Sequence, residues 1–181
     1  TIEKTTQYGR ITPDPIPHKV KFKSQYPAAN IRRRNEPVSA DIIYSDTPAI
    51  DGGETAAVLF FGTESMVTTA HGIKNDAQFV NALEDEIRRR GAMDKLITDY
   101  AAVERSQRVH HILRSLFIDS WYSKPYHEHQ NPVERRYQTV KGYVNRVMNR
   151  TGCPAFAWLL CLMWVCYILN RLSCSALGGD I

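Results

Sequence analysis

The order of apolar segments along the chain restricts its possible folds more than any other feature of the sequence. Apolar or β-branched runs at residues 38–44, 56–61 and 66–71 are separated by polar segments, which predicts three consecutive strands with a hairpin between the last two. Helix-like and strand-like segments then alternate, and the expected elements lie at residues 75–90, 96–98, 109–117, 120–126, 132–150 and 155–172. This order, β-β-β-α-β-α-β-α-α, predicts an α/β fold in which a mixed five-stranded sheet carries helices on both faces.

The clearest helical pattern lies in the second half of the chain, where apolar residues recur at positions i, i+3, i+4, i+7 and i+8. These residues are Val109, Ile112, Leu113, Leu116 and Phe117. The preceding helix has Asn75 or Asp76 as its expected N-cap, and Gly91 as the residue that ends it. Both segments are therefore expected to be amphipathic helices.

The last expected helix, residues 155–172, is apolar on almost every side. Such a helix is either buried or packed against a partner chain. Its apolar run, residues 154–169, contains 16 residues and is shorter than the roughly 20 residues that span a bilayer. We therefore expect no membrane partner, and a buried helix or an oligomer contact instead.

Basic residues are concentrated in two parts of a chain whose net charge is only +4. Residues 1–37 contain eight Lys or Arg against three acids, together with five prolines, and are expected to form a linker or arm. In the helix at 134–150, Glu134 is the only acid among five basic residues. Two basic blocks favour a polyanionic partner, although two solvated basic surfaces would give the same composition.

The apolar pattern also predicts the domain boundaries. The core is expected to span residues 38–172, and residues 173–181 to form a tail toward a missing C-terminal region. A chain of 181 residues suits one domain with tails. Because the chain begins without a methionine, we expect it to be a piece of a longer protein.

Three acidic residues stand at positions where the expected fold can bring them together. Asp41 lies within the first strand, Asp99 ends the fourth strand, and Glu134 is in the first turn of a helix. Carboxylates from separate elements form the oxygen ligand sets that Mg²⁺ and Mn²⁺ prefer, and two such ions can promote phosphodiester chemistry. Asp46 and Asp51 compete with Asp41 for the first position. Each acid alone also has a structural explanation, because Asp often ends strands and Glu often begins helices.

Short motifs around the last two acids are specific when taken together. Asp99 is followed by Glu104, residues 125–135 contain Pro-Tyr…Gln-Asn-Pro-Val-Glu-Arg, and residues 167–171 are Tyr-Ile-Leu-Asn-Arg. Through these motifs, residues 38–172 resemble the catalytic core of a copia-type retrotransposon integrase, a branch of the retroviral integrase superfamily.

Two departures from that family lie beside the acids. The spacing between Asp99 and Glu134 is 34 residues, one fewer than is usual in the family. Tyr100-Ala101-Ala102 replaces its Asn-Gly-Gly, which removes a polar side chain and backbone flexibility next to the second acid. These differences leave open a copy that folds but no longer cuts DNA.

The resemblance implies an RNase H-like fold, to which the apolar C-terminal helix is an addition. It also implies a metal-dependent reaction in two steps: nicking near the ends of the element's DNA copy (3′-end processing), then strand transfer of each 3′-hydroxyl into target DNA. Asp41, Asp99 and Glu134 would be the catalytic residues and the ligands of two Mg²⁺ or Mn²⁺ ions.

Further residues are expected to contact DNA. On the helix that carries Glu134, the resemblance assigns this role to Gln138 and Lys141, which follow at i+4 and i+7 on the same face. Arg135 in the same basic helix is expected to contact DNA as well. A solvated helix face is the alternative for Lys141. By charge alone, a phosphate-contacting arm is expected at Arg32, Arg33 and Arg34.

The resemblance also implies partners and a place of action. The partners are element-end DNA, target DNA, further copies of the chain in a dimer or tetramer, and the rest of a Pol polyprotein. The place of action is the nucleus, after assembly in cytoplasmic particles. Two other interpretations stay open: a catalytically decayed core kept for DNA binding or self-association, and a stand-alone nuclease of the same fold.

Overall fold

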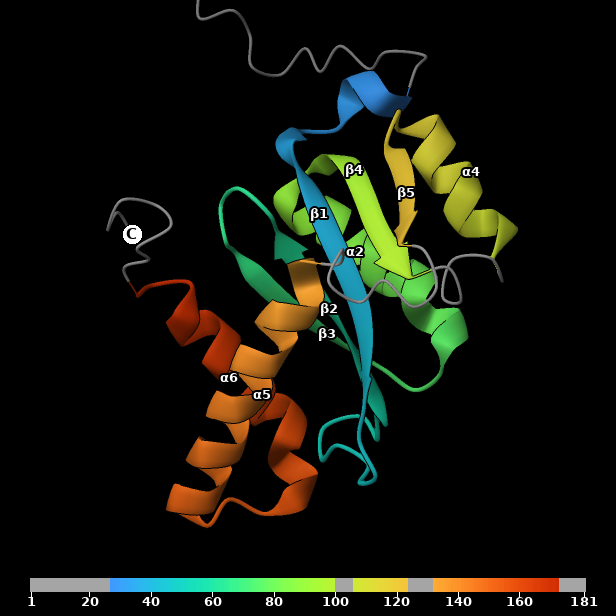
Figure 1. The fold of residues 1–181 in the computed structure, drawn as a ribbon. Helices are drawn as coiled ribbons and strands as arrows, with labels where there is room; N and C mark the ends of the chain where they lie inside the picture. Colours follow the sequence, from blue (N-terminus) through green and yellow to red (C-terminus); the bar gives the residue numbers. More distant parts are fainter. Residues whose placement is uncertain (1–26, 100–105, 124–131, 173–181) are drawn as a thin grey trace, which may run out of the picture.

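Five strands form one mixed sheet in the computed structural model, which describes residues 27–99, 106–123 and 132–172. The strand order is β3-β2-β1-β4-β5 (Figure 1). The pairs β1–β2 and β2–β3 are antiparallel, whereas β1–β4 and β4–β5 are parallel. The strands are β1 (Arg33–Tyr44), β2 (Ala56–Gly62), β3 (Thr68–Ile73), β4 (Ala92–Asp99) and β5 (Asp119–Ser123). The predicted mixed five-stranded sheet is confirmed.

Helices cover both faces of this sheet. Helices α2 and α4 pack on one face and α5 and α6 on the other, as Figure 1 shows. The helices are α2 (Phe79–Arg90), α4 (Gln107–Ser115), α5 (Pro132–Thr151) and α6 (Trp158–Leu169), and the short 3₁₀ turns are η1 (Pro27–Asn30), η2 (Asp76–Gln78) and η4 (Ala155–Ala157). The predicted order of elements and the two-sided cover are therefore confirmed.

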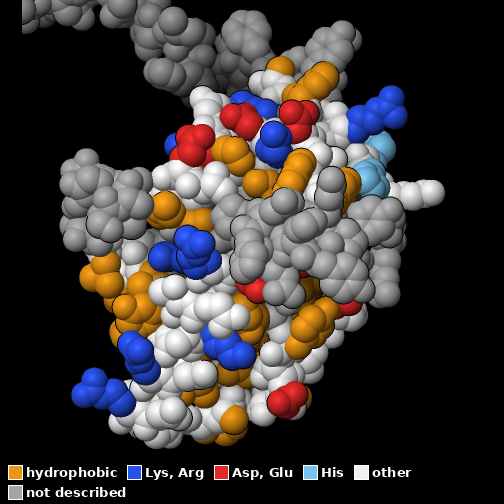
Figure 2. Space-filling view, in the orientation of Figure 1, with side chains coloured by type: hydrophobic (Ala, Val, Ile, Leu, Met, Phe, Trp, Pro, Cys, Tyr) orange, Lys and Arg blue, Asp and Glu red, His pale blue; other side chains and the backbone are white. Residues whose placement is uncertain are grey.

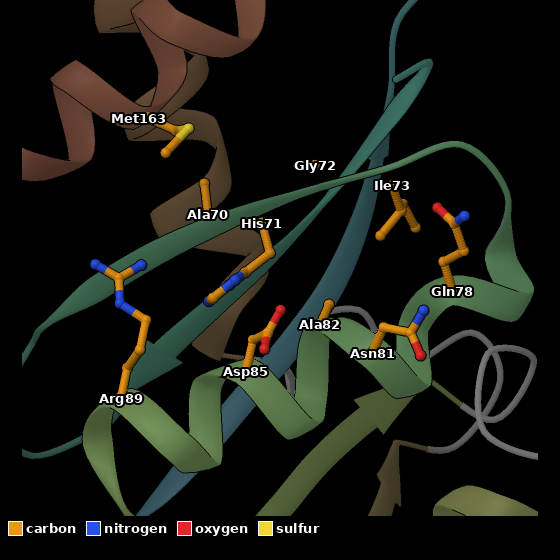
Figure 3. Close-up of a pocket in the computed structure, with 10 residues that line it drawn as sticks. All are labelled: Ala70, His71, Gly72, Ile73, Gln78, Asn81, Ala82, Asp85, Arg89 and Met163. Carbon is orange, nitrogen blue, oxygen red and sulfur yellow. The ribbon is translucent and has the colours of Figure 1, made fainter. Parts of the chain in front are cut away.

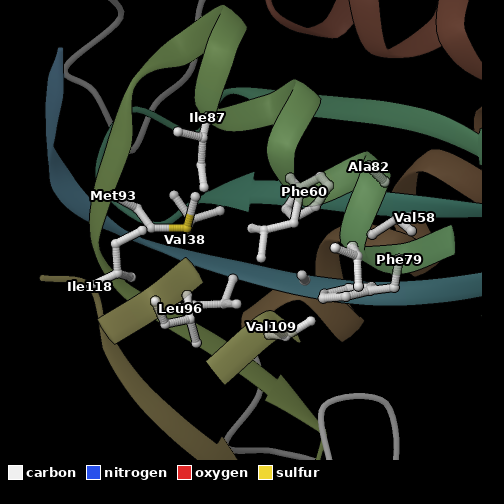
Figure 4. Packing of buried hydrophobic residues seen from close by; sticks show 14 of the residues in the cluster. Val38, Val58, Phe60, Phe79, Ala82, Ile87, Met93, Leu96, Val109 and Ile118 are labelled. Atoms are coloured by element: carbon white, nitrogen blue, oxygen red, sulfur yellow. The ribbon is translucent and has the colours of Figure 1, made fainter. Parts of the chain in front are cut away.

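The main apolar core lies between the sheet and the pair α2 and α4 (Figure 4). Its most deeply buried members include Val38 of β1, Phe60 of β2, Phe79 and Leu83 of α2, and Leu96 of β4. Burial of one side chain of this kind contributes about 1.5–3 kcal/mol to stability. The core therefore holds β1 and β4, the two strands that carry predicted acids, in a fixed relation.

Strand β1 begins five residues earlier than predicted. Arg33 and Arg34 already pair with Ala92 and Met93 of β4. The pairing is irregular between Arg34 and Pro37, and proline is tolerated where a ladder hydrogen bond is absent. The expected boundary between arm and core at residue 37 thus falls inside a strand, because Pro37 does not interrupt β1.

Two local details also differ from prediction. Asn75 makes no side-chain cap hydrogen bond, and the chain enters α2 through η2 instead. Helix α4 ends before Phe117, which has φ +52° and is 72% exposed. The amide of Ile118 donates to the carbonyl of Leu113 across this turn, so Phe117 occupies the left-handed position that usually ends a helix.

Helix α6 is buried on one side only. Leu159, Leu162 and Val165 belong to the second apolar cluster, and α6 packs against β3 and α5. The opposite side carries a stripe of exposed apolar residues, each 44–53% exposed. We call this set the α6 stripe: Phe156, Leu160, Met163, Trp164 and Tyr167. Among the helices of the described residues, none has the length and apolar content to cross a membrane.

Several predictions concern residues outside the described part of the chain. These are the arm at residues 1–26, the Tyr100-Ala101-Ala102 segment with Glu104, the end of the strand predicted at 120–126, the motif up to residue 131, and the tail at 173–181. Gly91 is described and ends α2 as predicted, with φ +102°.

Candidate active site

Asp41 and Asp99 lie side by side on neighbouring strands. The parallel register pairs Ser39 of β1 with Ile97 of β4, and each acid is two residues further along its strand. Because side chains alternate between the two faces of a sheet, residues two apart share a face. Asp41 also pairs with Leu59 of β2, which belongs to the cluster under α5 and α6. Both carboxylates therefore belong to the face that α5 covers.

Glu134 approaches from that same face. It lies in the first turn of α5, which packs against β1 and β2 and buries Val140 completely. Glu134 is half-buried and Asp99 is exposed. The packing of α5 thus brings the third predicted acid over the edge at which Asp41 and Asp99 stand.

The electrostatics of Asp41 show that the three acids are close. Burial raises the pKa of the Asp41 carboxyl, and the charges of Asp99 and Glu134 raise it further, to about 6 from its ordinary value of 3.8. The backbone amide of Ile42 donates to Asp41 Oδ1 at 2.8 Å and offsets part of this rise. Near neutral pH the site therefore gathers three negative charges that repel one another. Asp46, the competing first acid, lies past the end of β1 and is exposed.

The chemistry of these donors fits a divalent cation. Carboxylate oxygens are the preferred ligands of Mg²⁺ and Mn²⁺, and a cation would relieve the repulsion that raises the Asp41 pKa. Within the described ranges, no three His, Cys, Asp or Glu side chains are already arranged around a single ion position. The acids are therefore within electrostatic reach of one another without forming a closed ligand cage.

The residues predicted to contact DNA on α5 are available at its surface. Arg135, Gln138 and Lys141 are all exposed. The Lys141 ammonium lies 5.7 Å from the ring centroid of Tyr137, a distance at which a cation and an aromatic face attract. These side chains follow Glu134 along the same helix.

Arg33 and Arg34 have structural contacts that the predicted phosphate-contacting arm did not anticipate. Arg33 donates to the carbonyls of Leu116 and Phe117, at 2.6 Å and 3.2 Å. Arg34 forms ion pairs with Glu36 and Glu86, and its side chain is only 10% exposed. Both guanidinium groups are thus engaged within the chain because their residues belong to β1. Of the three arginines predicted to contact phosphate, Arg32 alone is exposed, and a DNA contact by any of them stays a prediction.

Glu86 is a buried acid that the sequence interpretation missed. Its side chain is fully buried and accepts hydrogen bonds from Arg34 at 3.0 Å and Thr69 at 2.8 Å, with His71 Nε2 at 3.1 Å. Burial acts to raise its pKa, but the hydrogen bonds and charges of these partners hold the pKa below 4.5. The sequence does indicate this burial, because Glu86 follows Leu83 by three residues and so lies on the apolar face of α2.

No protein-family model and no curated protein sequence matches the chain. Solved structures do match. The magnesium-bound HTLV-2 integrase catalytic core domain in its trimeric form superposes with a TM-score of 0.61 at 18% identity, over 81% of this chain and 92% of that one. The fold is that of a retroviral integrase catalytic core. The dimeric form of the HTLV-2 core gives a TM-score of 0.59 at 17% identity, over 76% of this chain and 88% of that one.

A longer integrase assembly matches as well. A chain of the simian T-cell lymphotropic virus intasome, determined with PP2A regulatory subunit B56 gamma, has a TM-score of 0.59 at 21% identity. The match covers 74% of this chain and 50% of that one, so this chain spans half of its length. At these identities the likeness concerns the fold, and the RNase H-like fold class predicted from the sequence is confirmed.

Proposed function

We propose that the chain is the catalytic core of a copia-type retrotransposon integrase. It would carry out 3′-end processing of the element's DNA copy and then strand transfer into target DNA. The observation that supports this most is the crowding of Asp41, Asp99 and Glu134 on one face of an integrase-like sheet, where burial and then the charges of Asp99 and Glu134 raise the Asp41 pKa to about 6. Acids that serve only the fold are not expected to lie where their charges raise one another's pKa.

Each residue has a distinct part in this proposal. Asp41, Asp99 and Glu134 would hold two Mg²⁺ or Mn²⁺ ions, which when bound supply positive charge to the attacking and leaving oxygens of a phosphodiester. Asp41, partly buried in the central strand β1, would set the position of the shared site. Gln138 and Lys141, exposed on the helix of Glu134, would orient the DNA backbone.

A strand-transfer assay on oligonucleotide substrates tests this function. Asp41→Asn, Asp99→Asn and Glu134→Gln should each lower the Mg²⁺-dependent product by at least about 100-fold, because each removes one charged ligand. Asp46→Asn is the matched control, an exposed acid outside the site, and should keep wild-type activity. Activity that survives all three active-site substitutions would overturn the assignment.

A second candidate is a catalytically decayed core kept for binding. It is favoured by the described carboxylates, which are close without being arranged around one ion position, and by the replaced segment after Asp99. The same assay separates the two. Salt-sensitive DNA binding without any Mg²⁺- or Mn²⁺-dependent product would identify the binding module.

We also propose that copies of the chain associate through the α6 stripe, as a dimer or tetramer. Contiguous exposed apolar surface is uncommon on monomers and marks interaction sites. Trp164→Glu should lower the sedimentation coefficient of the assembled protein to that of a monomer. Phe117→Glu, a change at an exposed aromatic residue on the face that α2 and α4 cover, should leave assembly intact, and equal effects would contradict the proposal.

The remaining part of the proposal concerns context. The core would belong to a Pol polyprotein, assemble in cytoplasmic particles and act in the nucleus. A tagged element should show nuclear signal from this segment during integration. Signal confined to the cytoplasm while new insertions accumulate would contradict this placement.

A further inference from the structure

An open cavity of about 610 Å³ lies at the edge of the sheet, where β3 passes between the C-terminal ends of α2 and α6. Three arginines line it: Arg89 and Arg90 from α2, and Arg171 just after α6. None of its described lining residues is Asp or Glu. We call this site the arginine cavity.

The arginines from α2 are not neutralised within the described part of the chain. Neither Arg89 nor Arg90 forms an ion pair or a side-chain hydrogen bond with another described residue. Their neighbour Arg88 behaves differently, because it pairs with Asp85 at 2.7 Å and does not line the cavity. Figure 3 shows Arg89 extending from α2 toward β3, beside His71 and on the same side as Met163. Two positive charges therefore line this edge without a carboxylate partner among the described residues.

The third arginine is held in a fixed orientation. The Arg171 guanidinium lies 3.4 Å from the ring centroid of Tyr167, and its Nη1 donates to the Tyr167 carbonyl at 3.0 Å. Stacking of this kind leaves the remaining N–H groups of the guanidinium free to contact a ligand and limits the entropy lost on binding. The positive charge at this wall of the cavity is thus preorganised.

A fourth arginine connects the cavity with the candidate active site. Arg136 Nε donates to Thr68 Oγ1 at 2.9 Å, and its guanidinium lies 5.7 Å from the ring centroid of Phe61. Thr68 lines the arginine cavity. Arg136 is only two residues after Glu134 on α5. The first turns of α5 therefore separate the carboxylates on one side from a positively charged surface on the other.

We propose that the arginine cavity binds the phosphodiester backbone of a nucleic acid. The inference rests on the proposed function, since the nucleic acid would be the one that reaches Asp41, Asp99 and Glu134. Arginine forks match phosphate oxygens, and contacts to phosphate carry no information about the base sequence. The contact is therefore independent of sequence and positions the strand that runs over α5.

Figure 2 shows Lys and Arg side chains interspersed with hydrophobic ones over α5 and α6. This distribution fits a backbone contact that continues beyond the candidate active site. An acidic segment from a second copy of the chain is the competing occupant, because Met163 and Tyr167 belong to both the cavity and the α6 stripe.

Salt-dependent binding of a DNA duplex, followed by fluorescence anisotropy, tests the inference. The cavity variant combines Arg89→Ala, Arg90→Ala and Arg171→Ala. The control variant removes the same charge from exposed arginines on the α2 and α4 side: Arg88→Ala, Arg108→Ala and Arg114→Ala. Circular dichroism confirms that both variants are folded, as expected for changes at exposed positions.

The cavity variant should bind more than about tenfold more weakly than the control at low salt. Each phosphate contact contributes about 0.9 to the slope of log K against log salt, so the slope should fall by about 2 to 3. Equal slopes in the two variants would overturn the inference, as would a wild-type protein that does not bind DNA. So would a cavity variant that changes only the sedimentation coefficient, because a second copy would then be the occupant.

Failure of the proposed function gives a different result. Wild-type protein that binds DNA through the cavity, yet forms no metal-dependent product, would remove the enzymatic proposal and keep the cavity. Metal-dependent product, together with slopes that the cavity variant does not change, would keep the enzymatic proposal and remove the cavity.

Discussion

Replacing Asp41 with asparagine should stabilise the protein at neutral and alkaline pH. In the wild type, burial and the charges of Asp99 and Glu134 oppose ionisation of Asp41, so its pKa is raised to about 6. Above that pH Asp41 carries a negative charge that is unfavourable in the folded protein. In the unfolded chain water solvates the same charge, so the penalty is absent there. Asparagine has the same shape and an oxygen that can still accept the amide hydrogen bond of Ile42, but it carries no charge.

The size of the gain follows from the pKa. A rise from 3.8 to about 6 corresponds to about 3 kcal/mol at 1.36 kcal/mol per pKa unit. Asp41 is only partly buried, so about 2 kcal/mol is expected after allowance for solvent screening. The sign follows from proton linkage: the folded state binds the proton more tightly, so the penalty is absent below pH 3.8, grows as pH rises, and is complete above about 6.

Urea unfolding at two pH values measures this effect. With a slope of about 2 kcal/mol per molar urea, Asp41→Asn should raise the midpoint by about 1 M at pH 7.5. At pH 4.5 about a third of the gain should remain. Asp46→Asn is the control, since its exposed carboxylate should contribute less than about 0.5 kcal/mol at either pH. A destabilised Asp41→Asn, or a gain that does not change with pH, would refute the reasoning.

Three further predictions concern the fold, and each is measured by urea unfolding. Gly91→Ala should destabilise the protein by more than about 2 kcal/mol, because φ is +102° and a Cβ would lie 2.7 Å from the Arg32 carbonyl oxygen. Gly142→Ala, in the open middle of α5, should instead stabilise the protein by up to about 1 kcal/mol. Equal effects at the two glycines would contradict this. Phe117→Gly should stabilise by about 1 kcal/mol, since an exposed side chain at φ +52° is strained; a loss would show that Phe117 packs. Glu86→Ala should cost about 3–5 kcal/mol by leaving its buried partners unpaired, and a change below about 1 kcal/mol would contradict that role.

The strands and helices could be predicted because their apolar spacing reflects the faces they bury. The pattern at Val109 and Leu113 identified α4, and both side chains are buried. The same pattern predicted that the helix continues to Phe117. This prediction is wrong, because periodicity does not reveal that the backbone turns left-handed there. Pro37 misplaced the start of β1 for a related reason: a local rule about proline ignores the irregular pairing that accommodates it.

The candidate site could be predicted only as a set of separate residues. The apolar runs before Asp41 and Asp99 indicated strand positions, but their adjacency depends on the parallel register of β1 and β4. The contacts of Arg33 with Leu116 and of Arg34 with Glu86 were out of reach, because these acceptors lie far along the chain. Charge in a sequence does not distinguish an arginine that is paired inside the fold from one that is open to a ligand.

A carboxyl-carbon NMR titration of Asp41, with and without Mg²⁺, tests most directly whether the three acids form one cation site. Without metal, the midpoint should lie at about 6. With saturating Mg²⁺ it should fall by more than one pKa unit, because a bound cation favours the charged carboxylate, while Asp46 stays unchanged. A midpoint near 3.8 without metal, or no response of Asp41 to Mg²⁺, would contradict a shared metal site at Asp41, Asp99 and Glu134.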